Sequence, residues 1–96
     1  MYPIYNIESV LIRSIGGIIM RVIFMGPNGL TVAKISMATY DMEDKFIYMA
    51  IADSNLIRTE IRIYNIGSQL AKEILNELFM TGCYDFSNSG YSIELN

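Results

Sequence analysis

The chain predicts an α+β domain: a four-stranded antiparallel β-meander with a C-terminal helix packed on one face, a short N-terminal helix and a short C-terminal strand. Three observations lead to this prediction. Four runs rich in β-branched and aromatic residues are separated by turn-forming segments, and one later segment repeats its apolar residues at helical spacing. A length of 96 residues is enough for one hydrophobic core. We therefore treat residues 1–96 as a single domain.

The N-terminal segment allows two interpretations. Over residues 6–15, apolar side chains recur at Ile7, Val10, Leu11 and Ile15, which is the spacing of one helix face. The β-branched residues in this segment favour a strand instead. We predict a short helix here and keep the strand as the alternative.

The first two strands of the meander are predicted at residues 18–25 and 30–38, joined by a Gly-Pro-Asn-Gly sequence. Pro27 fixes φ at the first turn position, Asn28 tolerates the second, and Gly29 accepts a positive φ. Two β-rich runs on either side of such a turn indicate a β-hairpin.

The third and fourth strands are predicted at residues 45–52 and 56–64. A polar connection at residues 39–44 precedes the third, and a tight turn at residues 53–55 separates the two. Apolar and polar residues alternate along the fourth strand, which predicts one covered face and one face in water. The apolar set is Ile57, Ile61 and Ile63, and the polar set is Arg58, Glu60 and Arg62.

The C-terminal helix is predicted at residues 68–81, with Ser68 as N-cap and Gly82 as the C-terminal stop. Beyond it, a turn-rich segment at residues 83–90 leads into an edge strand at residues 91–95. An apolar stripe at helical spacing faces the core. The stripe consists of Leu70, Ala71, Ile74, Leu75, Leu78 and Phe79.

The composition argues against catalysis. The chain has no His and one Cys, and it lacks a glycine-rich phosphate signature. His is the usual general base near neutral pH, and a structural zinc site needs about four Cys or His ligands. We therefore predict a protein that is not an enzyme and that uses no cofactor and no metal.

The lone Cys83 cannot form an intramolecular disulfide, which suits a reducing compartment. The N-terminus lacks the pattern of a signal peptide, and the most hydrophobic stretch, residues 15–25, is short and contains Arg21. We therefore expect a cytoplasmic protein with no membrane partner.

The charge pattern points away from nucleic acid and toward protein partners. Seven basic residues are scattered among ten acidic ones, giving a net charge of −3. Only 18% of residues are charged while 52% are hydrophobic, and there are seven Tyr and seven Met. Little charge is available to cover the surface, so we expect apolar or aromatic surface that a partner covers.

Two groups of residues are candidates for partner binding. The acidic connection lacks the spacing of an EF-hand, which favours a solvated loop over a Ca²⁺ site, and its charge would complement a basic surface on a partner. Alternate positions on the fourth strand place two arginines and a glutamate on one sheet face, with Tyr64 and Tyr48 nearby. The predicted partner-binding residues are Tyr40, Asp41, Glu43, Asp44, Arg58, Glu60 and Arg62.

The sequence thus predicts a small protein-binding module that acts as an inhibitor or adaptor on a larger protein. By analogy in size and composition, one concrete form is an inhibitor from a phage or mobile element directed at a nucleic-acid-processing complex, such as an anti-CRISPR inhibitor of a host defence nuclease. One alternative is a homo-oligomer, most simply a homodimer, with a structural or small-ligand-binding role. The second alternative is a nucleic-acid binder that uses the Arg58 and Arg62 face.

Overall fold

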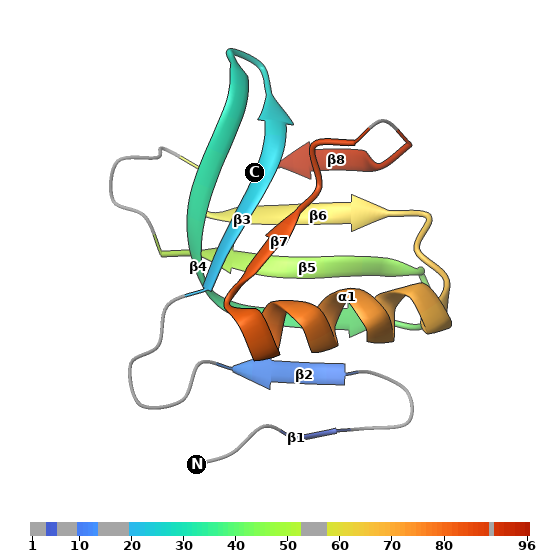
Figure 1. Cartoon of the computed structure of the whole chain (residues 1–96). Helices are drawn as coiled ribbons and strands as arrows, with labels where there is room; N and C mark the ends of the chain where they lie inside the picture. The colour runs from blue at the N-terminus through green and yellow to red at the C-terminus, as the bar shows by residue number, and fades with distance from the viewer. Residues whose placement is uncertain (1–3, 6–9, 14–19, 53–57, 89) are drawn as a thin grey trace.

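The computed structural model describes residues 4–5, 10–13, 20–52, 58–88 and 90–96 (Figure 1). The predicted α+β class is confirmed: the described residues form a sheet with one helix packed against it. In chain order the elements are β1 (Ile4–Tyr5), β2 (Val10–Arg13), β3 (Met20–Gly26), β4 (Gly29–Asp41), β5 (Phe46–Ile51), β6 (Glu60–Tyr64), α1 (Ser68–Thr81), β7 (Cys83–Asp85) and β8 (Ser92–Leu95).

The sheet is larger than the predicted meander. Strands β3, β4, β5 and β6 pair in succession and antiparallel, as expected. Six strands lie in the order β1-β2-β4-β5-β6-β8, with β3 paired to β4 off this path. Strand β7 pairs with β3 in parallel, which makes the sheet mixed. The parallel pairing of β7 was not predicted, because three residues carry too little alternation to indicate a strand.

Strand β4 connects the two parts of the sheet. Its N-terminal half pairs with β3, while its C-terminal half lies between β2 and β5. The register with β5 shifts between Ile35 and Met37, and an irregularity of this kind bends a strand. The β3–β4 hairpin consequently projects past β5, β6 and β8 (Figure 1). At its tip, Gly29 has the positive φ that the sequence predicted, +111°.

Helix α1 has the predicted bounds, but its N-cap differs from the prediction. Ser68 is the first helical residue and Gly67 is the N-cap, with no side-chain capping hydrogen bond. The C-terminal stop at Gly82 is confirmed: its φ is +79°, and its N–H donates to the Leu78 carbonyl at 2.8 Å. The helix lies against β2, β4, β3 and β7.

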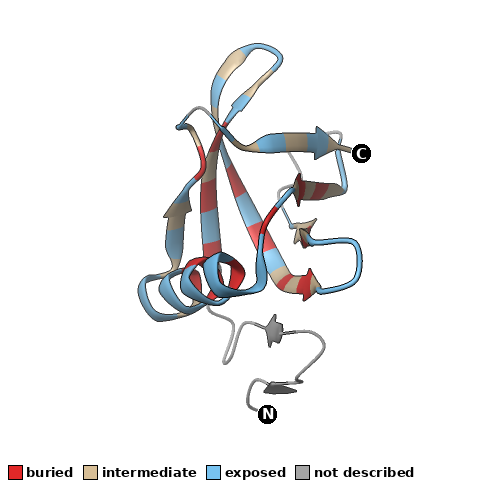
Figure 2. Ribbon diagram, turned by 90° about the vertical axis from the view of Figure 1, so that its right-hand side faces the viewer, coloured by how far each residue is buried: buried red, intermediate tan, exposed pale blue. Residues whose placement is uncertain are grey.

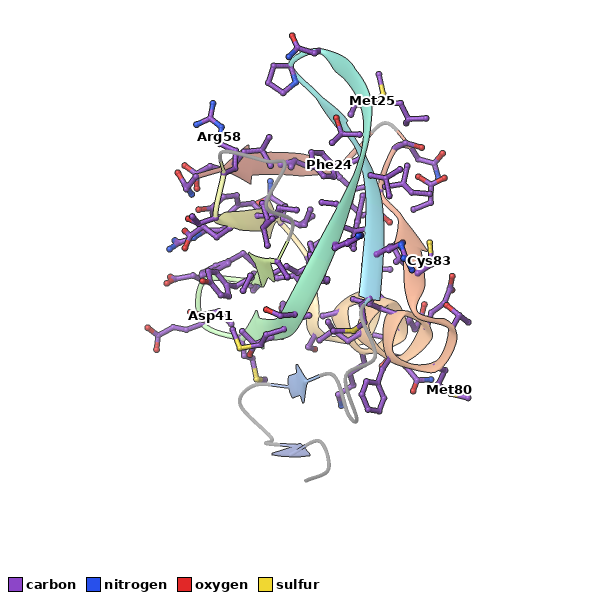
Figure 3. The ribbon with its side chains drawn as sticks, turned by 90° about the vertical axis from the view of Figure 1, so that its left-hand side faces the viewer. Phe24, Met25, Asp41, Arg58, Met80 and Cys83 are labelled. Carbon is purple, nitrogen blue, oxygen red and sulfur yellow. The ribbon has the colours of Figure 1, made fainter. Side chains whose placement is uncertain are left out.

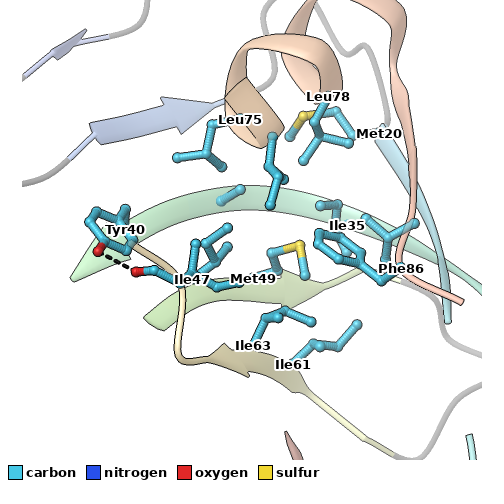
Figure 4. Packing of buried hydrophobic residues seen from close by; sticks show 14 of the residues in the cluster. Met20, Ile35, Tyr40, Ile47, Met49, Ile61, Ile63, Leu75, Leu78 and Phe86 are labelled. Atoms are coloured by element: carbon cyan, nitrogen blue, oxygen red, sulfur yellow. Dashed lines mark hydrogen bonds between the residues drawn. The ribbon is translucent and has the colours of Figure 1, made fainter. Parts of the chain in front are cut away.

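The hydrophobic core fills the space between α1 and the strands (Figures 2 and 4). Among the described residues, the buried side chains are hydrophobic. The one buried tyrosine in that part of the chain, Tyr40, donates its hydroxyl hydrogen to the Ile66 carbonyl. The buried residues are Met20, Val22, Phe24, Ala33, Ile35, Ala38, Tyr40, Ile47, Met49, Ile61, Ile63, Ile66, Ala71, Ile74, Leu75, Leu78 and Phe86.

The predicted N-terminal helix is wrong where the structure describes it. Val10–Arg13 is strand β2, and it pairs antiparallel with β4 through Leu11 and Thr39. The edge of β4 that faces away from β5 offers backbone N–H and C=O groups, and a strand can pair with them whereas a helix cannot. The rest of the predicted helix, residues 6–9 and 14–15, lies outside the described residues.

Several predicted boundaries also shift. The second strand runs on to Asp41, so the predicted polar connection begins inside β4. The fourth strand starts at Glu60, with Arg58 exposed ahead of it, and residues 53–57 lie outside the described residues. The predicted edge strand is confirmed as β8. Cross-strand pairing, rather than local composition, sets these strand ends.

Candidate functional site

Alternation along β4, β5, β6 and β8 places one set of side chains opposite the core. Ile47 of β5 and Ile63 of β6, for example, are buried on the inner face, while the residues before and after each of them along its strand are half-buried on the outer face. The strand registers arrange these outer residues in two rows across the sheet. The rows are Thr39, Tyr48, Arg62 and Glu94, and Asp41, Phe46, Tyr64 and Ser92.

The parts of these rows on β4 and β5, Arg62 of β6 and the turn after β4 line an open depression of about 750 Å³, which we call the outer groove. A depression of this volume is in the range that accommodates a ligand or an anchoring side chain. Its walls combine aromatic, acidic and cationic groups. The lining residues are Thr39, Tyr40, Asp41, Met42, Glu43, Phe46, Tyr48 and Arg62.

Arg62 lies on the outer face between Tyr48 of β5 and Glu94 of β8. Its guanidinium carbon is 5.2 Å from the ring centroid of Phe46 and 5.9 Å from that of Tyr48, both within cation–π range. Its Nε donates to Glu60 Oε1 at 3.2 Å. The Tyr64 hydroxyl and Glu60 raise the pKa of Arg62 above its ordinary value, so the group stays charged. The guanidinium therefore lies over two aromatic rings and is hydrogen-bonded at Nε.

The groups around Arg62 are also held by hydrogen bonds. The Tyr64 hydroxyl donates to Glu94 Oε1 at 2.8 Å, and this contact together with Asn96 lowers the pKa of Glu94. Burial, and then the adjacent Glu60, raises the pKa of Tyr48. Hydrogen bonds therefore connect several side chains of the outer face to one another.

An acidic turn forms one rim of the groove. Asp41 Oδ1 accepts the backbone N–H groups of Glu43 at 2.9 Å and Asp44 at 3.0 Å. These bonds fold residues 42–45 back after β4, and Lys45 closes the turn with a φ of +56°. The exposed side chain of Met42 lies in the same rim. Acidic and apolar groups thus share this edge of the groove.

The structure brings the two predicted groups together. Asp41 and Glu43 line the groove with Arg62, and Glu60 reaches it through its contact with Arg62. Asp44 is exposed in the same turn. The acidic connection and the fourth-strand face are therefore one surface, because β5 lies between β4 and β6 and continues it.

Two of the predicted residues are placed differently. Arg58 is exposed before β6 begins and does not line the groove. Tyr40 touches the groove, but it is only 3% exposed and its hydroxyl is bonded to the Ile66 carbonyl, so it has no free polar group to offer. Phe46 and Met42 were missed. The alternation of Phe46 with the buried Ile47 was the available signal for the first of them.

Comparisons with models of protein families, with curated proteins and with solved structures find no match to this chain. The chemistry of the site is therefore the basis for a functional assignment. Within the described ranges, no group of three or more Cys, Asp or Glu residues is placed to hold a metal ion. In the same ranges, no helix has the length and apolar character needed to cross a membrane.

The outer groove brings several kinds of interacting group together. It offers two aromatic rings, a guanidinium fixed over them, and carboxylates along the rim. Figure 3 shows Asp41 on the opposite side of the molecule from Met80 and Cys83, so the exposed thiol of Cys83 is remote from this surface. Aromatic residues and Arg are the types that carry most of the binding energy in protein interfaces.

Proposed function

We propose that this protein is a small non-catalytic protein-binding module whose interface is the outer groove. The observation that carries the proposal is that the Arg62 guanidinium lies over Phe46 and Tyr48, within cation–π range of both, in a depression of about 750 Å³. Arg and Tyr dominate interface hot spots when they lie in a depression that a partner can seal from water. Arg62, Tyr48 and the depression on one face support the proposal.

The fixed position of Arg62 adds to its value as an anchor. Immobilising a rotamer-rich side chain on binding costs about 0.5–1.5 kcal/mol. In this protein the aromatic rings and Glu60 already restrict the guanidinium, while its side chain remains 36% exposed. A partner therefore meets a charged planar group that is both accessible and pre-ordered.

The acidic rim supports one particular form of this function. Asp41 and Glu43 line one edge, Asp44 is exposed in the same turn, and a partner with a basic surface would be attracted to that edge. Basic surfaces are typical of nucleic-acid channels. An inhibitor that occupies such a channel on a nucleic-acid-processing complex is the concrete form we propose, and its binding would weaken as salt concentration rises.

Photo-crosslinking tests whether the outer groove is the interface. The crosslinking residue p-benzoylphenylalanine replaces Met42 at the groove rim and, as a matched control, the exposed Met80 on the far side of α1. We expect a discrete crosslinked protein in the source cell from position 42 and none from position 80. Arg62→Ala in the position-42 protein should abolish the product, with its fold checked by circular dichroism.

Two outcomes would contradict the proposal. Equal crosslinking from positions 42 and 80 would indicate non-specific contact. A position-42 product that survives both Arg62→Ala and Tyr48→Ala would show that the stacked arginine is not an anchor. Competition between the identified partner's nucleic acid and this protein then tests the inhibitor form.

A further inference from the structure

The β3–β4 hairpin carries a second surface, which we call the hairpin ladder. Its side chains alternate with the buried residues Val22, Phe24 and Ala33, so they point away from the core. The register pairs them directly across the two strands. The three pairs, from tip to base, are Met25 with Leu30, Ile23 with Val32, and Arg21 with Lys34.

The upper part of the hairpin ladder is apolar and open to solvent. Met25, Leu30 and Val32 are 52–67% exposed, and they make up half of the six large exposed hydrophobic residues in the described part of the chain. Their position on a projecting hairpin brings three of those residues into one patch, well removed from Asp41 at the other end of β4 (Figure 3). Exposed apolar patches on small proteins commonly mark contact sites.

The base of the ladder carries an unfavourable charge pair. The Arg21 N–H donates to the Gly82 carbonyl at 2.8 Å, and the Ile23 carbonyl accepts from Phe86 N at 2.6 Å. The backbone groups of residues 21 and 23 therefore face β7, so Arg21 and Lys34 form a non-hydrogen-bonded pair, the kind with the closest side chains. Like charges directly opposite destabilise a strand pair.

No carboxylate in the described residues neutralises this pair. The ion pair found among them joins Arg62 to Glu60 on the outer face. The acidic residue beside the ladder is Asp85, opposite Ile23 on β7, and its carboxylate accepts the Ser87 N–H at 2.8 Å. Within residues 20–52 and the other described ranges, the two cations at the base of the ladder have no ion-pair partner and can meet anionic groups of another molecule.

We propose that the hairpin ladder is a second docking surface, and that its occupant is a protein segment presenting aliphatic side chains beside carboxylates. The aliphatic groups would cover the Met25–Leu30 end, and the carboxylates would bind Arg21 and Lys34. The apolar end of the ladder beside its two cations matches a protein segment that carries aliphatic and acidic side chains together. This surface is independent of the outer groove and would make the protein an adaptor with two interfaces.

A titration of the isotope-labelled protein with a defined probe tests the proposal by nuclear magnetic resonance. The probe is a blocked hexapeptide of alternating glutamate and leucine. Comparison peptides replace its glutamates by lysine or its leucines by serine. We expect saturable amide shifts confined to residues 20–34 with the first peptide and weaker shifts with both others.

A charge reversal separates binding from stability. Lys34→Glu should raise the urea midpoint of the free protein, because it converts the repulsive pair with Arg21 into an attractive one. The same change should lower the affinity of the protein for the probe peptide by about fivefold or more. Lys72→Glu on the exposed side of α1 is the matched control and should leave the affinity for the probe unchanged.

Each alternative result would overturn the proposal. If millimolar probe causes no amide shifts in the hairpin, or if the lysine peptide causes equal shifts, the proposal that an acidic segment binds there is wrong. Undiminished binding by Lys34→Glu would show the same. Stronger hairpin shifts from phosphatidylserine vesicles or single-stranded DNA would assign the surface to a membrane or a nucleic acid. Concentration-dependent hairpin shifts without any probe would assign it to a second copy. Photo-crosslinking at the outer groove is unaffected by any of these results.

Discussion

Removal of the Tyr40 hydroxyl distinguishes a core role for this side chain from a role in partner binding. Tyr40→Phe deletes the hydrogen bond from that hydroxyl to the Ile66 carbonyl and changes little else in shape. Both residues are buried, and the bond ties the end of β4 to the segment before α1. If Tyr40 is structural, the variant loses stability and keeps its affinity for a partner.

The magnitude follows from the burial of both groups. A typical intramolecular hydrogen bond contributes about 0.5–1.5 kcal/mol, and a buried acceptor left without a donor costs about 1–3 kcal/mol. The Ile66 residue is 2% exposed, so water does not readily replace the lost donor. We expect a loss of about 1.5 kcal/mol in the free energy of unfolding, or roughly 6–12 °C in Tm for a domain of this size.

Urea unfolding and crosslinking at position 42 provide the two readouts. Tyr48→Phe is the matched control, because that hydroxyl lies on the half-buried outer face, and it should change stability by less than about 0.5 kcal/mol. Equal stability losses for the two variants would refute the assignment of Tyr40 to the core. Loss of crosslinking in a folded Tyr40→Phe protein would restore Tyr40 to the binding surface.

The pKa of Tyr40 gives the same variant a pH signature. Burial, and then Asp41, raises this pKa above its ordinary value of 10.0. The folded protein therefore holds the phenolic proton more tightly than the unfolded chain does. The corresponding stability is complete below about pH 10 and is lost as the pH rises through the folded pKa. Tyr40→Phe should reduce this alkaline loss.

Three further predictions concern other parts of the fold. Burial raises the pKa of Tyr84, so absorbance titration should show its tyrosinate forming at a pH above the ordinary pKa of 10.0, and an unshifted titration would contradict this. The stability of Tyr84→Phe should fall less steeply above pH 10 than that of the unmodified protein. Gly82→Ala places a Cβ on a residue with a φ of +79° and should lower the free energy of unfolding by about 1 kcal/mol. Gly67→Ala, at φ −70° with open space around it, should lower it clearly less, and equal losses in urea unfolding would refute the reasoning. Ile74→Ala creates a core cavity and should cost about 2–5 kcal/mol, while the exposed Leu70→Ala should cost much less by thermal unfolding.

Local signals in the sequence predicted the elements whose stability depends mostly on neighbours in the chain. Helix α1 matched its predicted bounds because an apolar stripe at helical spacing is followed by Gly82, which can adopt a left-handed conformation. The hairpin turn was predicted from Pro27 and Gly29 for the same kind of reason. The N-cap was wrong because Ser68 and Gly67 are adjacent, and either of them can begin a helix.

Elements that depend on distant partners were predicted poorly. Residues 10–13 have an ambiguous pattern locally, and pairing with the C-terminal half of β4 makes them a strand. Strand β7 is three residues long and exists through its parallel pairing with β3. A short segment gains its backbone hydrogen bonds from a neighbouring strand, and the sequence of that segment does not specify the neighbour.

The candidate site shows the same division. The sequence by itself determined that the chain has no His to serve as a catalytic base, and that Arg62 and Glu60 share an outer sheet face with Tyr64. Only the tertiary structure decided that Asp41 and Glu43 lie beside Arg62 across β5, that Tyr40 faces the core, and that Arg58 stands apart. The physical reason is that alternation fixes which face a side chain occupies, whereas strand order and register fix which other side chains it meets there.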